Sequence, residues 1–437
     1  MRKNLFKKVL ALTLASTMAF SMAGCGSKGG SSDAKNDDGT ITLNVWHQWS
    51  NDTNELKGKY EEAVKAYEKE NPGVKIKTET LDTEAYKTKI NAEFAGDAKG
   101  IDVFYWWGAG TAKKLVDAGK VMALDDYVTD DVKSKILEGS TSAFEFDGKL
   151  YSVPMFSWYM TLFCNKTMFD KAGATLPTTY DELVDAVKKL KKLDGVTPMA
   201  AGAKDGWNAA FVYQALALRE VGATGVNEML SGNKEFGDEG FKKAAQKVSD
   251  LYEMGAFGDN PLEQGNDDAN AAFENGKAAM RLMGSWFANN VYTDDAATIK
   301  PEEVVALKIP TIADGKGEAT DYCGGFVESF WVNNNTKYKE EAAKFCIYIN
   351  EKMGVASYET GSGFSGWTTP ADESNLNPLF IQIKDLLAEG KQGVLAWDTS
   401  LESEPAAVHN EQVQTLFADG ADIDAFIDEH KAAINGK

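Results

Sequence analysis

The feature that most constrains the fold is a regular alternation of apolar strand patterns with amphipathic helix patterns. Residues 41–46 indicate a strand, the apolar positions of 56–67 fall on one helix face, and 74–78 alternates as a second strand. A helical stripe over 86–94 leads to the continuous apolar run 101–105, which is typical of a strand buried on both faces. This βαβαβ order predicts an α/β fold whose ligand-facing edge carries the loops after the strand ends.

The length of the chain predicts two lobes. The sequence has 437 residues, and the part expected to fold, residues 40–437, exceeds the ~250–300 residues over which a single core keeps growing. After a hairpin signal at Asp147-Gly148, a second series of strands and helices begins, with Thr179 and Glu182 as a capping box. Since no long linker separates the two series, we expect the chain to cross between the lobes more than once.

The N-terminus has the pattern of a secretory leader. Basic residues precede the apolar run 9–20, which is too short to span the ~30 Å of a bilayer core. The sequence Met22-Ala-Gly-Cys25 then resembles a bacterial lipoprotein cleavage site, where the cysteine is acylated. We therefore expect residues 1–24 to be a signal peptide, Cys25 to carry the lipid, and residues 25–39 to form a flexible tether. Ordinary cleavage with an incidental cysteine is the alternative.

Charge and cysteine content exclude several classes of function. Cleavage before Cys25 would leave 42 basic and 66 acidic side chains, a net charge of −24, which disfavours nucleic acid as a partner. The remaining cysteines, Cys164, Cys323 and Cys346, form no Cys-x-x-Cys pair, so the sequence indicates neither a zinc site nor a redox motif. Cys346 lies on the apolar stripe of a predicted helix and is expected to be a small buried hydrophobe.

Motifs of covalent catalysis are absent from the sequence. It contains no Gly-x-Ser-x-Gly elbow, no phosphate-binding loop and no His-Glu-x-x-His. Two of the three histidines, His409 and His430, lie in late, polar helix patterns, where a solvated or capping role is usual. The Asp-rich stretch 265–268 is favoured as a helix cap over a calcium site. We therefore expect a protein that is not an enzyme and needs no cofactor or metal.

The positions of the tryptophan residues are the main indication of function. All ten tryptophans lie after the predicted leader, and several follow strand ends or glycine-rich turns. Flat aromatic surfaces suit the apolar face of a sugar ring, while Asp, Glu, Asn and Gln suit its rim of hydroxyl groups. Trp46 and Trp331 lie inside strand patterns and are expected mostly in the core. The remaining chain has two arginines, Arg219 and Arg281, which disfavours a phosphorylated or dicarboxylate ligand. A cationic ligand fits the same composition and stays a rival.

Segments along the mature chain carry a family resemblance. The strongest is Ala272–Met280 followed by Gly284-Ser-Trp286, and supporting segments are Leu43–Trp49, Gly100–Phe104, Tyr151–Pro154, Asn165–Phe169 and Gly325–Val332. Together they resemble the extracellular solute-binding family that includes maltose-binding protein, whose pattern is Phe-x-x-Gly-Lys-Ala-Ala-Met with a later Gly-x-Trp. Gly100-Ile101-Asp102 departs from the family's usual Pro-Asp, which weakens that segment alone.

The resemblance implies a periplasmic-binding-protein-like α/β fold of type II. Two lobes would be joined by three crossings and would close around a ligand by a hinge motion. The crossings are expected after the hairpin that ends at Pro154, near Glu302, and over 353–363. The expected division is 40–153 with 303–352 for the N-lobe, and 154–302 with 353–437 for the C-lobe.

The resemblance also implies a function and a set of site residues. The chain would be the substrate-binding component of an ABC import system, a monomer held by the Cys25 lipid on the extracellular face of the bacterial cytoplasmic membrane. It would capture a mono- or oligosaccharide and deliver it to membrane permease subunits. Matched positions that would contact the ligand are His47, Gln48, Trp49, Trp106, Trp107, Trp286, Gly325 and Phe326, and loop position adds Trp207, Asn208 and Trp367.

Alternatives to this reading stay open. For His47, a structural role at a strand end competes evenly with ligand contact. For the whole protein, the alternatives are a binding protein for a polyamine or other cationic solute and, less favoured, a surface glycosidase, for which no motif selects two carboxylates.

Overall fold

The structure is a computed structural model that describes residues 39–51, 55–293 and 297–436. These residues belong to one compact unit that spans 35–437. The expected signal peptide, the lipidation site Cys25 and nearly all of the expected tether lie outside the described residues.

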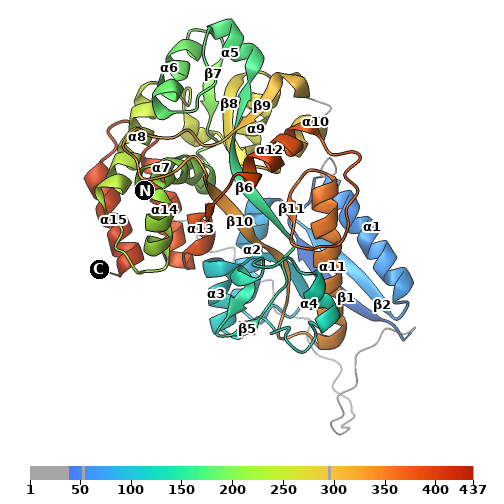
Figure 1. The fold of residues 1–437 in the computed structure, drawn as a ribbon. Helices are drawn as coiled ribbons and strands as arrows, with labels where there is room; N and C mark the ends of the chain where they lie inside the picture. The colour runs from blue at the N-terminus through green and yellow to red at the C-terminus, as the bar shows by residue number, and fades with distance from the viewer. Residues whose placement is uncertain (1–38, 52–54, 294–296, 437) are drawn as a thin grey trace, which may run out of the picture. The chain divides into compact units, whose positions relative to one another are not determined.

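The strands of the described chain form one ten-stranded sheet, with both parallel and antiparallel pairing, and a separate two-stranded sheet (Figure 1). They are β1 (Ile41–His47), β2 (Val74–Thr80), β3 (Val103–Trp107), β4 (Glu145–Phe146), β5 (Lys149–Leu150), β6 (Phe156–Asn165), β7 (Thr197–Ala200), β8 (Ala278–Gly284), β9 (Val304–Leu307), β10 (Asp321–Val332), β11 (Phe364–Ser365) and β12 (Gln392–Val394). The main path is β2-β1-β3-β10-β6-β8-β7, with β9 and β11 on β6 and β12 on β10. Because β1 pairs in parallel with both β2 and β3, the βαβαβ prediction is confirmed.

Helices cover this sheet, and six of those in the described chain have an N-cap side chain that accepts a backbone N–H of the first turn. They are α1 (Glu55–Glu70), α2 (Thr83–Ala95), α3 (Ala109–Asp117), α4 (Asp130–Lys135), α5 (Lys166–Ala172), α6 (Tyr180–Leu190), α7 (Gly206–Leu230), α8 (Glu239–Glu253), α9 (Asn266–Glu274), α10 (Phe287–Thr293), α11 (Lys339–Glu359), α12 (Pro378–Ala388), α13 (Trp397–Ser400), α14 (Ser403–Thr415) and α15 (Ile423–Asn435). Three short 3₁₀ segments are Ser142–Phe144, Pro261–Glu263 and Pro301–Glu303.

Two of the predicted caps are confirmed. Thr179 Oγ1 accepts from the Glu182 backbone N–H at 3.3 Å, and the Glu182 carboxylate accepts from the Thr179 backbone N–H at 3.1 Å, so both halves of the capping box form. Asp268 accepts the Gly265 N–H at 3.0 Å and thereby caps α9. Across the described residues, no cluster of three or more His, Cys, Asp or Glu is placed to hold a metal ion. Within the same part of the chain, no helix is long and apolar enough to cross a bilayer.

Two separate hydrophobic cores form on this sheet, which confirms the two-lobed α/β fold. The first core is built on β1, β3 and α11, and its fully buried side chains include Tyr60, Phe104 and Trp331. The second core is built on β6, β8 and α7, with Phe163 and Tyr213 among its fully buried side chains. Trp46, Trp331 and Cys346 are buried in the first core, as expected from their strand and helix patterns.

The chain passes between the cores along its longest strands. On β6, Phe156 packs in the first core and Trp158 in the second, and on β10, Cys323 packs in the second core and Phe330 in the first. Figure 1 shows β6 and β10 side by side, in agreement with their antiparallel pairing. The sequence predicted that the chain crosses back to the first core near Glu302. Because β9 pairs with β6 inside the second core, the chain crosses back later, along β10.

A buried histidine pair corrects one prediction. His409 and His430 were expected in solvated or capping positions, yet both are fully buried in the second core. His430 Nδ1 lies 2.9 Å from the Phe426 carbonyl oxygen and must donate to it, so its Nε2 accepts from His409 Nδ1 at 2.9 Å. His409 Nε2 then accepts from Gln214 Nε2 at 3.0 Å. Both rings are therefore neutral, and each can replace an apolar residue because its nitrogens are paired.

We predict that this pair makes the protein less stable in acid. Burial lowers the pKa of His430 to about 4, and burial together with the neighbouring His430 lowers the pKa of His409 well below its usual value. Below pH ~6.5 these two histidines bind protons in the unfolded chain but stay neutral in the folded chain. The free energy of unfolding therefore falls as the pH drops toward 4. By pH 5 the free energy of unfolding should fall by about 2 kcal/mol per histidine.

Urea unfolding at pH 7.5 and pH 5.0 tests this prediction against a His409→Leu/His430→Leu double variant. The wild-type protein should lose more free energy of unfolding than the variant over this interval. Equal losses in the two proteins would contradict the assignment of neutral buried rings.

Candidate functional site

Aromatic rings gather where β1 and β3 end. His47 is the last residue of β1 and Trp49 lies two residues later, and their rings have centroids 5.1 Å apart. Tyr105 packs 5.5 Å from Trp49 and 5.2 Å from Trp107 at the end of β3, and Trp106 lies 5.4 Å from Trp107. The predicted residues after the two strands are thus brought together, because β1 and β3 are neighbours in the sheet. We call these five residues the first aromatic cluster.

His47 is held in this cluster with one nitrogen paired. Its Nδ1 accepts from the Trp49 backbone N–H at 3.2 Å, which leaves Nε2 as the protonated nitrogen. Burial, reinforced by the charge of Lys57, lowers the pKa of His47 to about 3, so the ring is neutral at physiological pH. His47 Nε2 and the Oε1 atom of Gln48 are both buried and have no hydrogen-bond partner among the described residues. His47 therefore has a structural bond and one unused donor.

A second aromatic cluster forms on the other core. Trp286, which follows β8, lies 5.1 Å from Trp158 and 6.4 Å from Phe211 between ring centroids. Trp207, in the first turn of α7, packs 5.3 Å from Phe211 and 6.5 Å from Trp286. The structure therefore places the predicted residues Trp207 and Trp286 together. Trp158 and Phe211 were missed, since they lie inside β6 and α7, where aromatic residues usually indicate core.

Asn208 has a positioning role. It is buried, and its Oδ1 accepts from the Arg281 guanidinium at 2.7 Å. Arg281 also donates to the Ala200 and Ala201 carbonyls and to the side chains of Asn266 and Asn270. This buried guanidinium fixes the start of α7, which carries Trp207.

Three predicted positions lie outside the two clusters. The Trp367 indole N–H donates to the Pro154 carbonyl at 2.7 Å, and its ring packs in the first core. Gly325 faces Leu395, since a Cβ at Gly325 would stand 2.6 Å from Leu395 Cδ2. Phe326 is half-buried against the first core. In the described residues no ring contact links Trp367 or Phe326 to either cluster.

One ammonium group lies between the two clusters. Lys87, on α2, has its Nζ 5.2 Å from the ring centroid of Trp107 and 5.8 Å from that of Trp207. The same Nζ pairs with Glu84 Oε1 at 3.0 Å. Aromatic faces from both cores therefore meet at one point in the molecule. No local pattern distinguishes Lys87 from the other lysines of the chain, so its position at the site could not be predicted.

Two carboxyl groups interact electrostatically with Lys87: Glu328 lies opposite Trp107 in the pairing of β10 with β3, and Asp398 is the second residue of α13. Burial raises the pKa of Glu328 to about 7, and the charge of Lys87 offsets part of the increase. Burial also raises the pKa of Asp398, again partly offset by Lys87, and Asp398 Oδ1 is buried without a partner in the described chain. Glu328 had a sequence signal, as a carboxylate within the largely apolar run 326–332. Aromatic faces beside carboxyl groups suit a ring with an apolar face and a polar rim.

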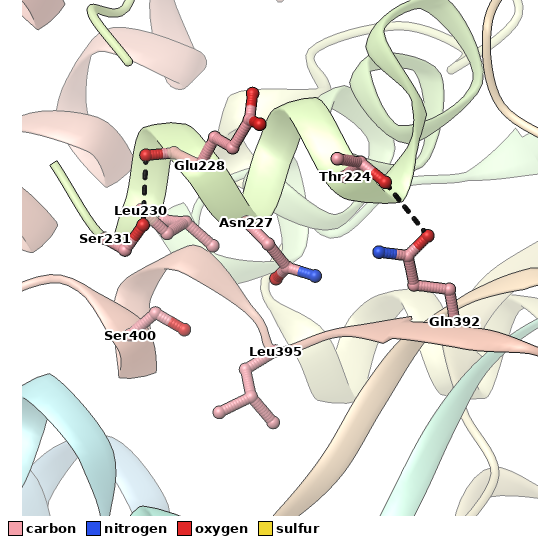
Figure 2. Close-up of a pocket in the computed structure, with 8 residues that line it drawn as sticks. All are labelled: Thr224, Asn227, Glu228, Leu230, Ser231, Gln392, Leu395 and Ser400. Carbon is pink, nitrogen blue, oxygen red and sulfur yellow. Dashed lines mark hydrogen bonds between the residues drawn. The ribbon is translucent and has the colours of Figure 1, made fainter. Parts of the chain in front are cut away.

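A separate groove of about 520 Å³ lies on the second core, beside the last turns of α7 (Figure 2). Its lining is polar apart from Leu230 and Leu395, with Thr224 Oγ1 hydrogen-bonded to Gln392 Oε1 at 3.1 Å. No aromatic residue lines it. The groove therefore lacks the flat surfaces that the two clusters offer.

Comparison with known proteins identifies the family. A family model described as bacterial extracellular solute-binding protein matches residues 50–355. The multiple sugar-binding protein of Streptococcus mutans is 24% identical over 368 residues, which cover 81% of this chain and 80% of that protein.

Solved structures share the fold over nearly the whole chain. One, from work on xylan utilization by the thermophilic bacterium Caldanaerobius polysaccharolyticus, is 36% identical with a TM-score of 0.86 and covers 90% of this chain and 100% of that one. A chitin oligosaccharide binding protein is 22% identical with a TM-score of 0.81 and covers 91% and 98% of the two chains. The matched segments, the two-core α/β fold and these similarities show that the chain belongs to the bacterial extracellular solute-binding protein family.

Proposed function

We propose that this protein captures a mono- or oligosaccharide between its two aromatic clusters and delivers it to the permease subunits of an ABC import system. The observation that carries the proposal is the meeting of Trp107 from the first core with Trp207 from the second, within about 11 Å between ring centroids. A sugar ring in contact with two aromatic faces needs about 7–8 Å between them, at ~3.5–4.0 Å per contact. The sugar-binding and chitin-oligosaccharide-binding names of similar proteins support the same ligand class.

The site residues divide by role in this proposal. Trp107, Trp207 and Trp286 would stack on sugar rings, and Glu328 and Asp398 would accept hydrogen bonds from hydroxyl groups. His47 Nε2 and Gln48 Oε1 offer one further donor and one acceptor. Trp49 and Trp106 would support the first cluster, and Asn208 would position Trp207. All of these roles are in binding and none is in a catalytic step, so we propose no enzymatic activity.

The proposed mechanism is a cycle of opening and closure. A ligand that contacts both cores favours the closed form in proportion to its differential affinity for that form. Closure would then present surfaces of both lobes to the permease. We propose that the protein acts as a monomer, held at the membrane by a lipid on Cys25. Replacing Cys25 by Ala should release the protein into the medium, and retention of that variant on the membrane would exclude the anchor.

Closure of the two lobes can be tested at Gly110, in the first turn of α3. A Cβ on Gly110 would lie 2.2 Å from the Ser400 carbonyl oxygen and 2.4 Å from that of Leu401, which packs in the second core. Gly110→Ala should therefore disfavour the closed form and weaken binding about tenfold or more, since apparent affinity falls with the closed fraction. Calorimetric Kd values test this, with Gly58→Ala as the control, because nothing lies within 4 Å of a Cβ at Gly58. Unchanged affinity in Gly110→Ala would contradict closure at this contact.

The ligand class is tested with intrinsic tryptophan fluorescence and melting temperature. Residues 40–437 are titrated with xylo-, cello-, chito- and malto-oligosaccharides and with spermidine. The proposal predicts a saturable fluorescence change and a raised melting temperature with one class of oligosaccharide. A response to spermidine alone would replace the carbohydrate by a cationic ligand.

A further inference from the structure

The chain places one of its own cations where a ligand would stack. Lys87 Nζ lies over the rings of Trp107 and Trp207, at 5.2 and 5.8 Å, and these indoles belong to different cores. An electron-rich indole face is the best protein surface for a ligand cation. Lys87 therefore already fills the position that an ammonium ligand would take.

Lys87 stays near this position when a ligand enters. Its ammonium group pairs at 3.0 Å with Glu84, which lies one turn earlier on the same helix. This pair would keep the positive charge close to the two rings if a sugar ring displaced the ammonium group from between them. A cationic ligand would then meet a like charge in a partly buried place, which is strongly unfavourable.

An anionic ligand meets the opposite obstacle. Glu328 lies directly opposite Trp107 in the pairing of β10 with β3, and Trp107 is one of the two indoles that the Lys87 ammonium group contacts. The Asp398 carbonyl oxygen accepts from Thr111 Oγ1 on α3 at 3.2 Å, and Asp398 Oδ1 is buried and unpaired in the described chain. The charge of Lys87 acts on both carboxyl groups. Lys87 is also occupied by Glu84. A ligand carboxylate that approached Lys87 would therefore compete with Glu84 for the ammonium group and would meet the carboxyl groups of Glu328 and Asp398.

We propose that Lys87, together with Glu328 and Asp398, restricts this site to uncharged ligands. The ammonium group excludes cations, the carboxyl groups exclude anions, and all three can hydrogen-bond to the hydroxyl groups of a neutral sugar. The inference rests on the proposed function and narrows it. Among glycans, the site takes neutral oligosaccharides and rejects those that carry amino sugars or uronic acids.

Calorimetry with ligands of different charge tests this selectivity. The neutral probes are xylotriose and cellotriose, the cationic probes are choline, spermidine and the chitosan trisaccharide, and the anionic probe is xylotriose substituted with glucuronic acid. The wild-type protein should bind at least one neutral probe and should bind each charged probe at least tenfold more weakly. Lys87→Met should improve binding of the cationic probes relative to the neutral one by tenfold or more, and Glu328→Gln should do so for the anionic probe.

A matched control lies on the same helix. Lys89 Nζ is 5.1 Å from the ring of Trp46 and pairs with Glu79, outside both aromatic clusters. Lys89→Met should leave every affinity ratio unchanged. Lys87→Gln serves as a second variant, and melting temperatures confirm that each variant is folded.

The outcomes separate the two proposals. If the wild-type protein binds a neutral probe and its charged counterpart equally, or if Lys87→Met leaves the ratios unchanged, charge selection by these residues is wrong while carbohydrate capture stands. If Lys87→Met loses affinity for the neutral probe while the ratio of its affinities for charged and neutral probes is unchanged, Lys87 has only a structural role. If no neutral oligosaccharide binds the wild-type protein, carbohydrate capture itself is wrong.

Discussion

Replacing Arg281 by Met is expected to lower the free energy of unfolding by about 3–5 kcal/mol, because a buried hydrogen-bond network would lose its guanidinium donor. The guanidinium donates to two backbone carbonyls and three asparagine side chains, all of which would stay buried in the variant. Burial lowers the pKa of Arg281 to about 9, with Glu274, Asp205 and Asp267 opposing the shift, so the group remains charged at neutral pH. Urea unfolding followed by circular dichroism measures the loss.

The same substitution should weaken ligand binding. Arg281 fixes Asn208, and Asn208 lies beside Trp207 at the start of α7. Lys99→Met is a suitable control, since Lys99 pairs with Asp97 on an exposed surface. A loss of less than about 1 kcal/mol for Arg281→Met would show that water replaces the guanidinium at low cost.

Replacing Trp107 or Trp207 by Ala is expected to raise the Kd for the oligosaccharide about 30-fold or more, the effect of losing ~2 kcal/mol at an interaction hot spot. Both side chains are only half-buried, so folding should be nearly unaffected. Because the two rings would hold the ligand from opposite cores, the double variant should show no measurable binding. Trp107→Phe, which keeps a flat face, should retain part of the affinity.

Calorimetric titration at constant salt measures these losses. Phe146→Ala is the matched control, since Phe146 is a half-buried ring that packs on Tyr151 at 6.0 Å in the β4–β5 hairpin. Full affinity in both single tryptophan variants would contradict stacking at this point and would move the ligand elsewhere on the molecule.

Much of the fold could be predicted because its signals are local. The strand and helix periods of residues 41–105 determine a βαβαβ unit, and the caps at Thr179 and Asp268 follow from side chains three residues from the helix start. The burial of the histidine pair was not predicted, because the polar composition of the last helices indicated exposed positions. Ala406, His409 and Val413 nevertheless lie on one buried face of α14, so the helical period marked His409 as a core position.

The site could be predicted only in part. Trp107 is the last residue of β3 and Trp286 follows β8, and sequence position alone places such residues at the edge of a sheet. Lys87, Glu328 and Asp398 lie on α2, β10 and α13, which are distant in the chain and meet only through the packing of the two cores. No local pattern encodes such a meeting. The second crossing was misplaced for a similar reason, since the short strand β9 belongs to the second core through its pairing with β6.

A crystal structure of residues 40–437 with the tightest-binding neutral oligosaccharide tests the central claim most directly. The account predicts a sugar ring against the indoles of Trp107 and Trp207, with hydroxyl groups hydrogen-bonded to Glu328 or Asp398 and the Lys87 ammonium group moved aside. An oligosaccharide bound instead in the groove of Figure 2, near Thr224 and Ser400, and away from both aromatic clusters, would contradict it.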